Sequence, residues 1–304
     1  MTNKVAILIP VHNGLEYTQN CISTLKEQIA PFNQKRDIQF SLIVIDDGSS
    51  DGTADWIVSH HPDITLLEGD GSLWWSGGVT KGARHALETL NYNWVLLWNN
   101  DVVPNENYFL QLSSLIQDSK GDEIIGSKVC DLSNPNKIWS MGGFYNPKTG
   151  KKYMLGLDKA VTNKSDEVLE CDWLTGMGTL VHQKVFHQIG YWNTKDFPQY
   201  FGDTDFTYRA KKHGFRLIVD PKLILYNDTE NTGFIHQGSL KKLIQSLVSI
   251  RSKYNLRKEL RFYQLYAESP LAYMHILSKY TRYIGGFFKW KILGLLGIQK
   301  MQSN

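Results

Sequence analysis

The stretch Phe40-Ser41-Leu42-Ile43-Val44-Ile45, followed at once by Asp46-Asp47-Gly48-Ser49, indicates the fold class of this chain. A run of apolar residues this short and this continuous has the length and character of a strand that is buried on both faces. The acidic residues and the glycine that follow are typical of a turn at the carboxyl end of such a strand. Three further apolar runs have strand length: Val5–Val11, Ile64–Leu67 and Trp94–Trp98.

Helical patterns separate these runs, at residues 15–29, 53–60, 77–91 and 105–117. Alternation of strands and helices predicts βαβ units, and therefore an α/β fold with a mostly parallel, doubly wound sheet and helices on both faces. Each predicted strand is followed by a polar cluster. Because open α/β sheets bind ligands at the carboxyl ends of their strands, we expect these clusters to line one crevice.

The pattern changes twice along the chain. After residue 120 it loosens into short strands and turns, with helices predicted at 183–189 and 204–213 and a strand at 216–219. After residue 240 the sequence is helical, basic and aromatic to its end. With 304 residues, the length alone favours about two domains. We predict a nucleotide-binding half over 1–120, a second half over 121–239 and a C-terminal segment over 240–304.

Composition excludes several classes of protein. Hydrophobic residues make up 42% of the chain and charged residues 21%, which excludes disorder as a description of the whole chain. No apolar run reaches the ~18 residues that a bilayer span requires, and the N-terminus has no leader pattern. The three cysteines (Cys21, Cys130 and Cys171) are widely spaced, which excludes a disulfide framework and a cysteine zinc site and suits a reducing cytosol.

The net charge of +3 conceals an uneven distribution. Residues 240–304 contain twelve Lys or Arg but only two Glu, so this segment carries +10 and the remainder carries −7. Such a division suggests an acidic body, suited to a cation, with a basic appendage that meets an anionic surface.

Two acidic loops follow predicted strands. In Asp46–Thr53, a carboxylate can accept the N3–H of a pyrimidine base, and Asp51 or Thr53 can cap the next helix; a turn with a helix cap and no ligand is the plain alternative. Asn99-Asn100-Asp101 is suited to hold Mg²⁺ or Mn²⁺ on a diphosphate. Taken alone, this second loop is better explained as an Asx-rich turn without a ligand.

Two further stretches carry candidate chemistry. In Gly202-Asp203-Thr204-Asp205-Phe206, Asp203 is a candidate general base, and Asp205 can cap the helix or pair with Arg209 four residues on. In Trp74-Trp75-Ser76-Gly77-Gly78, the glycines let backbone N–H groups approach an anion, and tryptophan faces suit sugar rings. Helix caps and core tryptophans are the plain alternatives. The chain contains neither GxGxxG nor GxxxxGK[ST].

Taken together and in this order, these motifs resemble those of family 2 inverting glycosyltransferases, and most closely a bacterial rhamnosyltransferase-like branch. The resemblance covers roughly residues 4–236. It implies the GT-A fold, in which a nucleotide-sugar-binding α/β half (1–120 here) is continuous with an acceptor-binding and catalytic half (121–239). It also implies a divalent cation, Mg²⁺ or Mn²⁺.

The resemblance carries roles to particular positions. It makes Asp203 the general base and Asp101 the metal-binding acid, with His236 as a late metal ligand. Donor-binding residues are then Pro10, Val11, Asn13, Asp47, Trp75, Gly78 and Asn100, with Asp47 reading the base. Acceptor-binding residues are Trp173, Gly176 and Asp205.

The chain departs from the family pattern at four places. The D-x-D motif reads Asn99-Asn100-Asp101, and the E-D motif reads Gly202-Asp203. The asparagine of the third helix is Thr80, and the residue after Tyr226 is Asn227 where the family has histidine. The lost carboxylates predict weaker metal binding and leave a non-catalytic nucleotide-sugar-binding homologue as an alternative.

We therefore expect an enzyme that transfers a sugar from a nucleotide-diphosphate donor to a hydroxyl of a glycan or lipid-linked acceptor, in cell-surface polysaccharide synthesis. A nucleotidyltransferase is a further alternative, although the stretch after the first strand lacks its glycine-rich basic signature. Residues 270–304 predict contact with a membrane surface, or else a helical cap or oligomer contact; nucleic acid is not an expected partner. The expected location is the cytoplasm, on the inner face of the cell membrane.

Overall fold

The computed structural model describes residues 2–34, 37–157, 159–160, 167–228 and 239–295. Its contacts divide the chain into two compact units. Unit 1 comprises residues 1–144 and 153–232, and unit 2 comprises residues 145–152 and 233–304. Strands from both predicted halves of residues 1–239 share one sheet, and the boundary at residue 120 stays a prediction.

Unit 1 contains a mixed sheet in the order β10-β12-β6-β11-β4-β1-β2-β3, with β5 beside β12 and β7 beside β6. The strands are β1 (Asn3–Val11), β2 (Ile38–Asp46), β3 (Thr65–Glu68), β4 (Trp94–Leu97), β5 (Val102–Pro104), β6 (Glu123–Asp131), β7 (Ile138–Ser140), β10 (Leu169–Glu170), β11 (Thr179–His182) and β12 (Arg216–Asn227). Strands β1–β4 are mutually parallel, as are β6 and β12. The four predicted apolar runs form the parallel strands β1–β4, which confirms the expected fold class.

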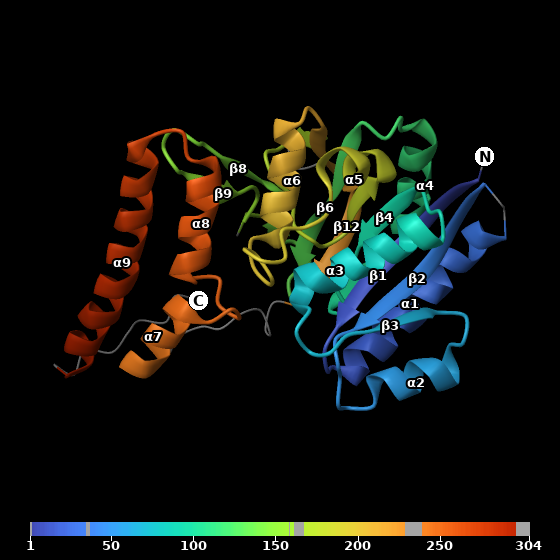
Figure 1. The fold of residues 1–304 in the computed structure, drawn as a ribbon, viewed down its shortest axis with the longest axis horizontal. Helices are drawn as coiled ribbons and strands as arrows, with labels where there is room; N and C mark the ends of the chain where they lie inside the picture. Colours follow the sequence, from blue (N-terminus) through green and yellow to red (C-terminus); the bar gives the residue numbers. More distant parts are fainter. Residues whose placement is uncertain (1, 35–36, 158, 161–166, 229–238, 296–304) are drawn as a thin grey trace. The chain divides into compact units, whose positions relative to one another are not determined.

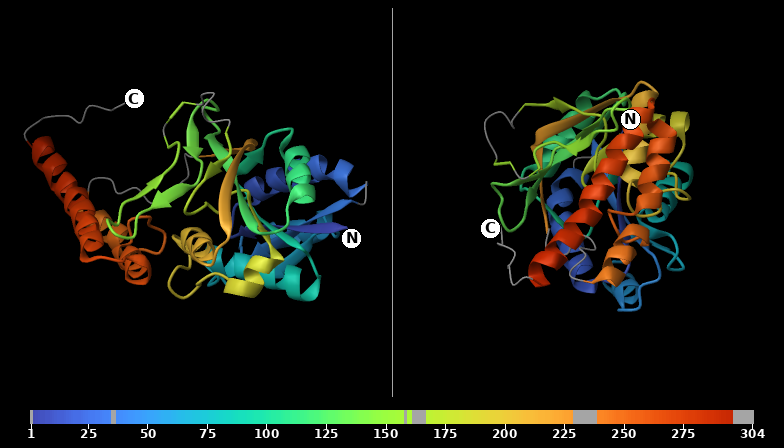
Figure 2. Two further views of the ribbon diagram at one scale, coloured as in Figure 1. Left: turned by 90° about the horizontal axis from the view of Figure 1, so that it is seen from above. Right: turned by 90° about the vertical axis from the view of Figure 1, so that its left-hand side faces the viewer.

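Helices cover both faces of this sheet (Figures 1 and 2). The unit 1 helices are α1 (Leu15–Asn33), α2 (Thr53–His60), α3 (Trp74–Arg84) with a π-helical turn at His85–Thr89, α4 (Tyr108–Asp118), α5 (Gln183–Ile189) and α6 (Gly202–Lys212). Alternate residues of β1 belong to two separate core clusters, one with α1, α2 and α4 and the other with α3, α5 and α6. Burial of both faces explains why the strands are continuously apolar.

The second part of the sheet differs from the prediction. Strand β11 lies antiparallel between β4 and β6, and β5 lies antiparallel to β12. The sequence pattern did not predict these pairings because short strands of three or four residues carry little periodicity. They matter for function, since they place the ends of β4, β5 and β12 in one region of unit 1.

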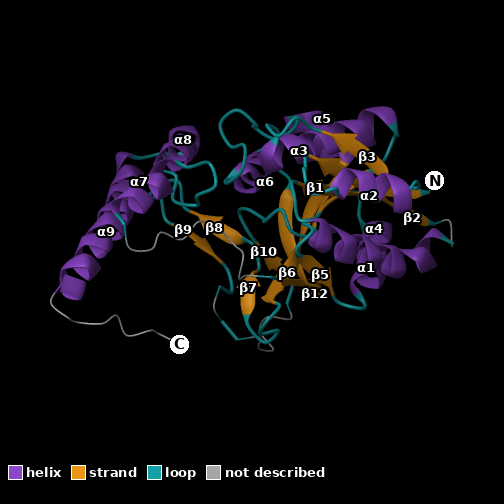
Figure 3. Ribbon diagram, turned by 90° about the horizontal axis from the view of Figure 1, so that it is seen from below, coloured by secondary structure: helices purple, strands orange, loops and turns teal. Residues whose placement is uncertain are grey.

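Unit 2 is built from three helices, α7 (Leu240–Val248), α8 (Leu256–Tyr266) and α9 (Pro270–Leu295), and from the tip of a hairpin formed by β8 (Gly143–Tyr145) and β9 (Lys152–Met154) (Figure 3). The ring of Tyr145 packs edge-on against Phe262 and Tyr263. The buried carboxylate of Glu259 pairs with Lys279 at 2.6 Å. None of the helices in the described ranges combines the length and hydropathy that crossing a bilayer requires.

Candidate active site

The loop after β2 is held by its own carboxylates. Asp46 accepts hydrogen bonds from the backbone N–H and the hydroxyl of Ser49, at 2.9 and 2.5 Å, which closes a tight Asx turn. The predicted donor residue Asn13 accepts from the N–H of Ser50 at 2.9 Å, while its own N–H donates to the Ser49 hydroxyl. The ends of β1 and β2 are therefore tied to each other by side chains.

Asp51 organises the starts of two helices. Its Oδ2 accepts from the N–H groups of Gly14 and Leu15 at the start of α1, and its Oδ1 accepts from Thr53 at the start of α2. Partial desolvation opposes ionisation, but the bonds from Thr53, Leu15 and Gly14 prevail and lower the pKa of Asp51 to about 2. Gly52 is the N-cap residue of α2 and supplies no side-chain cap; Asp51, one residue earlier, bonds the first N–H of that helix, and the same carboxylate serves the preceding helix as well.

Asp47 fixes the loop that leads into α3. Its carboxylate accepts from the N–H groups of Gly71, Leu73 and Trp74 at 2.9, 3.2 and 2.9 Å. The backbone of the same residue is also held, since its N–H donates to Val11 at 2.8 Å. A carboxylate offers about four lone-pair positions, so this buried side chain retains one for a further donor. The base-reading role of Asp47 stays a prediction.

The start of α3 contacts both neighbouring loops. Trp75 donates from its indole Nε1 to Asn99 Oδ1 at 3.1 Å, and its backbone N–H donates to Gln199 Oε1 at 3.1 Å. Its ring also lies against Gly176, where a Cβ would come within 2.1 Å of the indole. Trp75 thus joins segments that are a hundred residues apart in the sequence. The preceding Trp74 has a φ of 57°, a left-handed conformation that is uncommon for a bulky residue.

The other two predicted donor residues on β1 and α3 touch each other. A Cβ on Gly78 would lie 3.0 Å from Cβ of Pro10. The helix can approach the end of β1 this closely because residue 78 has no side chain. Asn100 points toward α1 instead, and its side-chain amide donates to Thr18 Oγ1 at 3.1 Å.

Asp101 lies beside a second carboxylate that the sequence motif did not indicate. Val102 of β5 pairs with Asn227 of β12, so Asp101 and Asp228 are the next residues on two antiparallel chains. The Asp228 N–H donates to the Asp101 carbonyl at 3.3 Å, and the Tyr17 hydroxyl donates to Asp228 Oδ2 at 3.1 Å. Burial raises the pKa of Asp101, and the charge of Asp228 raises it further.

This pair fits a divalent cation. Asp101 Oδ1 is buried and accepts no hydrogen bond from the described residues. Like charges directly across two strands are unfavourable, and a hard cation with oxygen ligands removes that cost. No group of three His, Cys, Asp or Glu side chains that could hold a metal occurs within the described ranges. Two carboxylates leave coordination positions of such a cation open, and the phosphate oxygens of a ligand are suited to fill them.

Asp203 lies in the first turn of α6, which begins at Gly202 after Phe201 in a left-handed conformation (φ 69°). Its Oδ1 accepts from the Thr204 N–H at 2.7 Å, and its Oδ2 accepts from the Gly176 N–H at 3.2 Å. Over residues 201–208, Asp203 alone is not fully buried. The helix start therefore presents a single carboxylate, fixed by two backbone groups and accessible at the surface.

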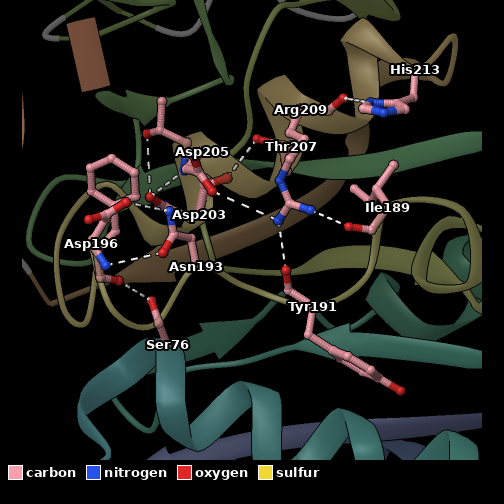
Figure 4. Close-up of polar contacts among 12 residues, drawn as sticks. Ser76, Ile189, Tyr191, Asn193, Asp196, Asp203, Asp205, Thr207, Arg209 and His213 are labelled. Atoms are coloured by element: carbon pink, nitrogen blue, oxygen red, sulfur yellow. Dashed lines mark hydrogen bonds and ion pairs between the residues drawn. The ribbon is translucent and has the colours of Figure 1, made fainter. Parts of the chain in front are cut away.

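Asp205 is buried instead. It lies 3.8 Å from the guanidinium of Arg209, and the latter donates to the carbonyl groups of Ile189 and Tyr191 (Figure 4). The predicted pairing of Asp205 with Arg209 is confirmed. The predicted acceptor contact of Asp205 stays a prediction, and with an exposed fraction of 1% the side chain is remote from the solvent an acceptor would approach through.

Packing explains the glycine that replaces the first acid of the E-D motif. A Cβ on Gly202 would lie 2.0 Å from Ser76 Oγ, which itself donates to the carbonyl of Phe197 at 2.6 Å. Figure 4 shows Ser76 on α3 directed toward this region. The N-terminus of α6 is therefore in contact with α3, and there is no room for a glutamate at residue 202 in this arrangement.

The contacts connect four of the predicted site residues. Asp47, Trp75, Gly176 and Asp203 form one chain of contacts in unit 1, through the backbone of residues 71–74 and of Gly176. Trp173 is buried against Gly143 rather than presented at the surface. The predicted metal ligand His236 lies outside the described residues.

Sequence reasoning missed Asp228 and Gln199. Asp228 follows Tyr226-Asn227, where the family pattern has a histidine, and only the register of β5 against β12 shows that it lies beside Asp101. The predicted strand ends at residue 219, so the available signal was only an acid that follows the apolar run Leu223-Ile224-Leu225-Tyr226. Gln199 lies in a loop without periodicity, so its contact with Trp75 had no signal in the sequence.

Comparisons with known proteins agree with this architecture. The low-salt glycan biosynthesis hexosyltransferase Agl10 of Haloferax volcanii is 27% identical over 175 residues, which are 58% of this chain and 54% of that protein. The chain thus matches about half the length of this curated relative. The crystal structure of GalNAc-T7 with UDP, GalNAc and Mn²⁺ is similar at a TM-score of 0.55 and 9% identity, over 89% of this chain and 58% of that one.

A mannosyltransferase of Pyrobaculum calidifontis, solved with GDP-Man and Mn²⁺, is similar at a TM-score of 0.54 and 12% identity, over 96% of this chain and 84% of that one. At these identities the solved structures support the GT-A fold alone. The model of the family described as glycosyl transferase family 2 matches residues 6–168, which is more than half of the chain. The chain therefore belongs to glycosyl transferase family 2.

Proposed function

We propose that this protein is an inverting hexosyltransferase that moves a sugar from a nucleoside-diphosphate donor to an acceptor hydroxyl, with Asp203 as the general base. The observation that carries the proposal is the position of Asp203. Its carboxylate is fixed by the N–H groups of Gly176 and Thr204, remains partly exposed, and is linked through Gly176 to the tryptophan that contacts Asn99.

The chemistry follows from this placement. In a single displacement, the acceptor oxygen attacks the anomeric carbon while the bond to the diphosphate breaks on the opposite face, so the anomeric configuration inverts. Asp203 Oδ2 or Oδ1 takes the proton from the attacking hydroxyl, and a positioned base of this kind contributes roughly 10²–10⁴ in rate. The two backbone N–H groups orient the carboxylate toward that hydroxyl.

Asp101 and Asp228 are the proposed ligands of Mg²⁺ or Mn²⁺. When bound, the cation would offset the negative charge that grows on the leaving diphosphate. The support is the buried Oδ1 of Asp101, which has no hydrogen-bond partner among the described residues, and the second carboxylate across from it. In this proposal Asp228 replaces the acid that the Asn99-Asn100-Asp101 motif lacks.

The remaining assignments follow the predicted residue roles. The donor would lie along the ends of β1, β2 and β4 and the start of α3, where the loop held by Asp47 approaches Trp75. Gly176 would border the acceptor in the half over residues 121–239, and the buried Trp173 would support that region through its packing against Gly143. The acceptor class is a glycan or a lipid-linked saccharide.

Finer parts of the same proposal are rhamnose as the sugar and cell-surface polysaccharide as the product. They rest on the motif order in residues 5–101 and, for glycan synthesis, on the similarity to a glycan biosynthesis hexosyltransferase. The proposal also includes a cytoplasmic location at the inner face of the membrane, with residues 270–304 as the contact.

A donor panel tests the proposal. Nucleotide-sugars are added with Mn²⁺ or Mg²⁺, and both thermal shift and released diphosphate are measured. We expect one nucleotide-sugar to stabilise the protein, by about 2.7 kcal/mol at ~100 times its Kd. The same donor should be turned over, and NMR should show an inverted product. Binding without turnover would favour the non-catalytic homologue, and a retained configuration would contradict single displacement.

Metal binding is tested separately from turnover. Asp101→Asn and Asp228→Asn should each weaken Mn²⁺ binding in the presence of the selected nucleoside diphosphate, by about tenfold or more, because each removes a charged oxygen ligand. Isothermal titration calorimetry gives the affinities. Asp131→Asn is the matched control, since that carboxylate accepts bonds from the Ser133 N–H and hydroxyl. Equal binding by Asp228→Asn and the control would exclude Asp228 as a ligand.

A further inference from the structure

Helix α9 of unit 2 is apolar on two opposite faces. Its inner face buries Ala272, Ile276, Tyr280 and Phe287, at the helical spacing of a packed face. Polar contacts lock this face in place: the Tyr280 hydroxyl donates to Glu259 at 2.8 Å. The helix is therefore fixed within unit 2 by one face, and its opposite face is turned away from that packing.

The outer face carries large apolar side chains in two groups, near the start and near the end of the helix, which we together call the α9 stripe. Its members are each 47–59% exposed: Leu271, Met274, Leu277, Phe288 and Ile292. At 100° per residue they fall within about a third of the helix circumference, and at 1.5 Å per residue they extend over roughly 32 Å. Exposed apolar area of this extent on one helix marks an interaction surface.

Charge distinguishes among the partners that could cover this stripe. Arg282 and Lys289 flank it on one side and Lys291 on the other, by their positions on the helix. The whole of unit 2 contains fifteen Lys or Arg and only two acidic residues, and one of these, Glu259, is buried against Lys279. A second copy of so basic a unit would be repelled, whereas an anionic surface would be attracted.

We propose that the α9 stripe docks in the interface of an anionic lipid bilayer, with the helix lying parallel to the membrane plane. Apolar side chains would enter the boundary between headgroups and acyl chains, and the flanking basic residues would reach the headgroup phosphates. A span is not involved, since no helix in the described ranges is suited to cross a bilayer. The inference gives residues to the membrane contact in the proposed function, but it does not depend on the transfer reaction.

Vesicle flotation tests the docking surface with the full chain. Wild-type protein should float with vesicles of phosphatidylcholine and phosphatidylglycerol and much less with phosphatidylcholine alone. Met274→Glu/Leu277→Glu should reduce binding to the vesicles at least tenfold, because two apolar side chains that would enter the bilayer are lost. Lys289→Glu/Lys291→Glu should reduce it about fivefold for each lysine removed. Leu110→Glu is the matched control, since Leu110 is also 59% exposed but lies on α4 of unit 1.

Each variant is first checked for folding by its thermal transition and for donor turnover, which should stay as in wild type. A variant that keeps donor turnover but no longer floats with the vesicles supports the docking surface, whatever the acceptor is. If the wild-type protein shows no turnover, only the proposed function is contradicted, because flotation does not depend on the transfer reaction. Equal flotation of Met274→Glu/Leu277→Glu and Leu110→Glu would overturn the inference. The inference would also be overturned if light scattering showed a wild-type dimer that Met274→Glu/Leu277→Glu abolishes. Binding to RNA without flotation on anionic vesicles would overturn it as well.

Discussion

Two groups of aspartates in unit 1 differ in what surrounds them. Asp46, Asp47 and Asp51 accept their hydrogen bonds from loops and helix starts, and each holds a segment in place. Asp101 and Asp228 instead lie across from each other, each next to an end of the paired strands β5 and β12, and one oxygen of Asp101 is buried with no hydrogen-bond partner among the described residues. The comparison teaches that acids of similar motif appearance divide into those that hold loops and helix starts in place and those that we propose as ligands of a cation.

The largest effect on stability is expected from Asp47→Ala. Three N–H groups, of Gly71, Leu73 and Trp74, would lose a charged acceptor in a buried position. We expect a loss of about 2–4 kcal/mol in the free energy of unfolding, measured by urea denaturation. Asp70→Ala is the control, because that exposed carboxylate bonds only with Ser72 among the described contacts. If Asp47→Ala lowers the free energy of unfolding no more than Asp70→Ala does, Asp47 does not hold the loop in place.

The next effect tests the close contact between α3 and α6. Gly202→Ala should destabilise the protein by about 1–3 kcal/mol, since the new Cβ would collide with Ser76 Oγ. Removing that oxygen with Ser76→Ala should restore part of the loss in the double variant. Urea denaturation of the four proteins gives the coupling energy. If the losses of the two single variants simply add in the double variant, the contact between residue 202 and Ser76 Oγ is not the cause of the destabilisation.

A smaller effect of opposite direction is expected at Asp101. Without metal, Asp101→Asn removes a like-charge contact with Asp228, so we expect the free energy of unfolding to stay equal or to rise by up to about 1 kcal/mol. Asp47→Asn serves as the comparison and should be clearly destabilising. Metal-free thermal unfolding in the presence of a chelator measures both. Equal destabilisation by Asp101→Asn and Asp47→Asn would contradict the proposed difference between the two groups of aspartates.

The smallest effect is a pH dependence from Asp51. Its pKa is lowered from 3.8 to about 2, so its ionised form is favoured in the folded protein. The resulting stability is present above pH 3.8 and is lost as the pH falls toward about 2. We expect the difference in Tm between wild type and Asp51→Asn to shrink over this interval. A difference that is independent of pH would contradict the assignment, and Asp55→Asn on α2 gives the baseline.

The sequence predicted the parallel part of the fold well because those strands are uniformly apolar and the helices between them are periodic. The predicted helix at 53–60 coincides with α2, and the predicted helix at 183–189 coincides with α5. Strands β5 and β11 escaped prediction because their three or four residues are defined by pairing across long sequence distances. Long-range pairing leaves no periodic signal in a single chain.

The candidate site was predictable in part for the same reason. Motifs that follow apolar strands indicated Asp47 and Asp101 as site residues, and a predicted helix start indicated Asp203. The partnership of Asp101 with Asp228 depends on the register of β5 and β12, which the sequence does not encode locally. Likewise, the sequence shows only that residue 202 lacks the acid of the family motif. The reason, a close contact of Gly202 with Ser76, is apparent only in the structure.

The most direct test of the account is the turnover of Asp203→Asn with the donor that the panel selects. We expect kcat to fall by roughly 10²–10⁴, while affinity for the nucleoside diphosphate with Mn²⁺ and the thermal transition stay close to wild type. Asp118→Asn, at the exposed end of α4, is the matched control. Turnover that survives in Asp203→Asn would contradict the assignment of the base, and with it the proposed mechanism.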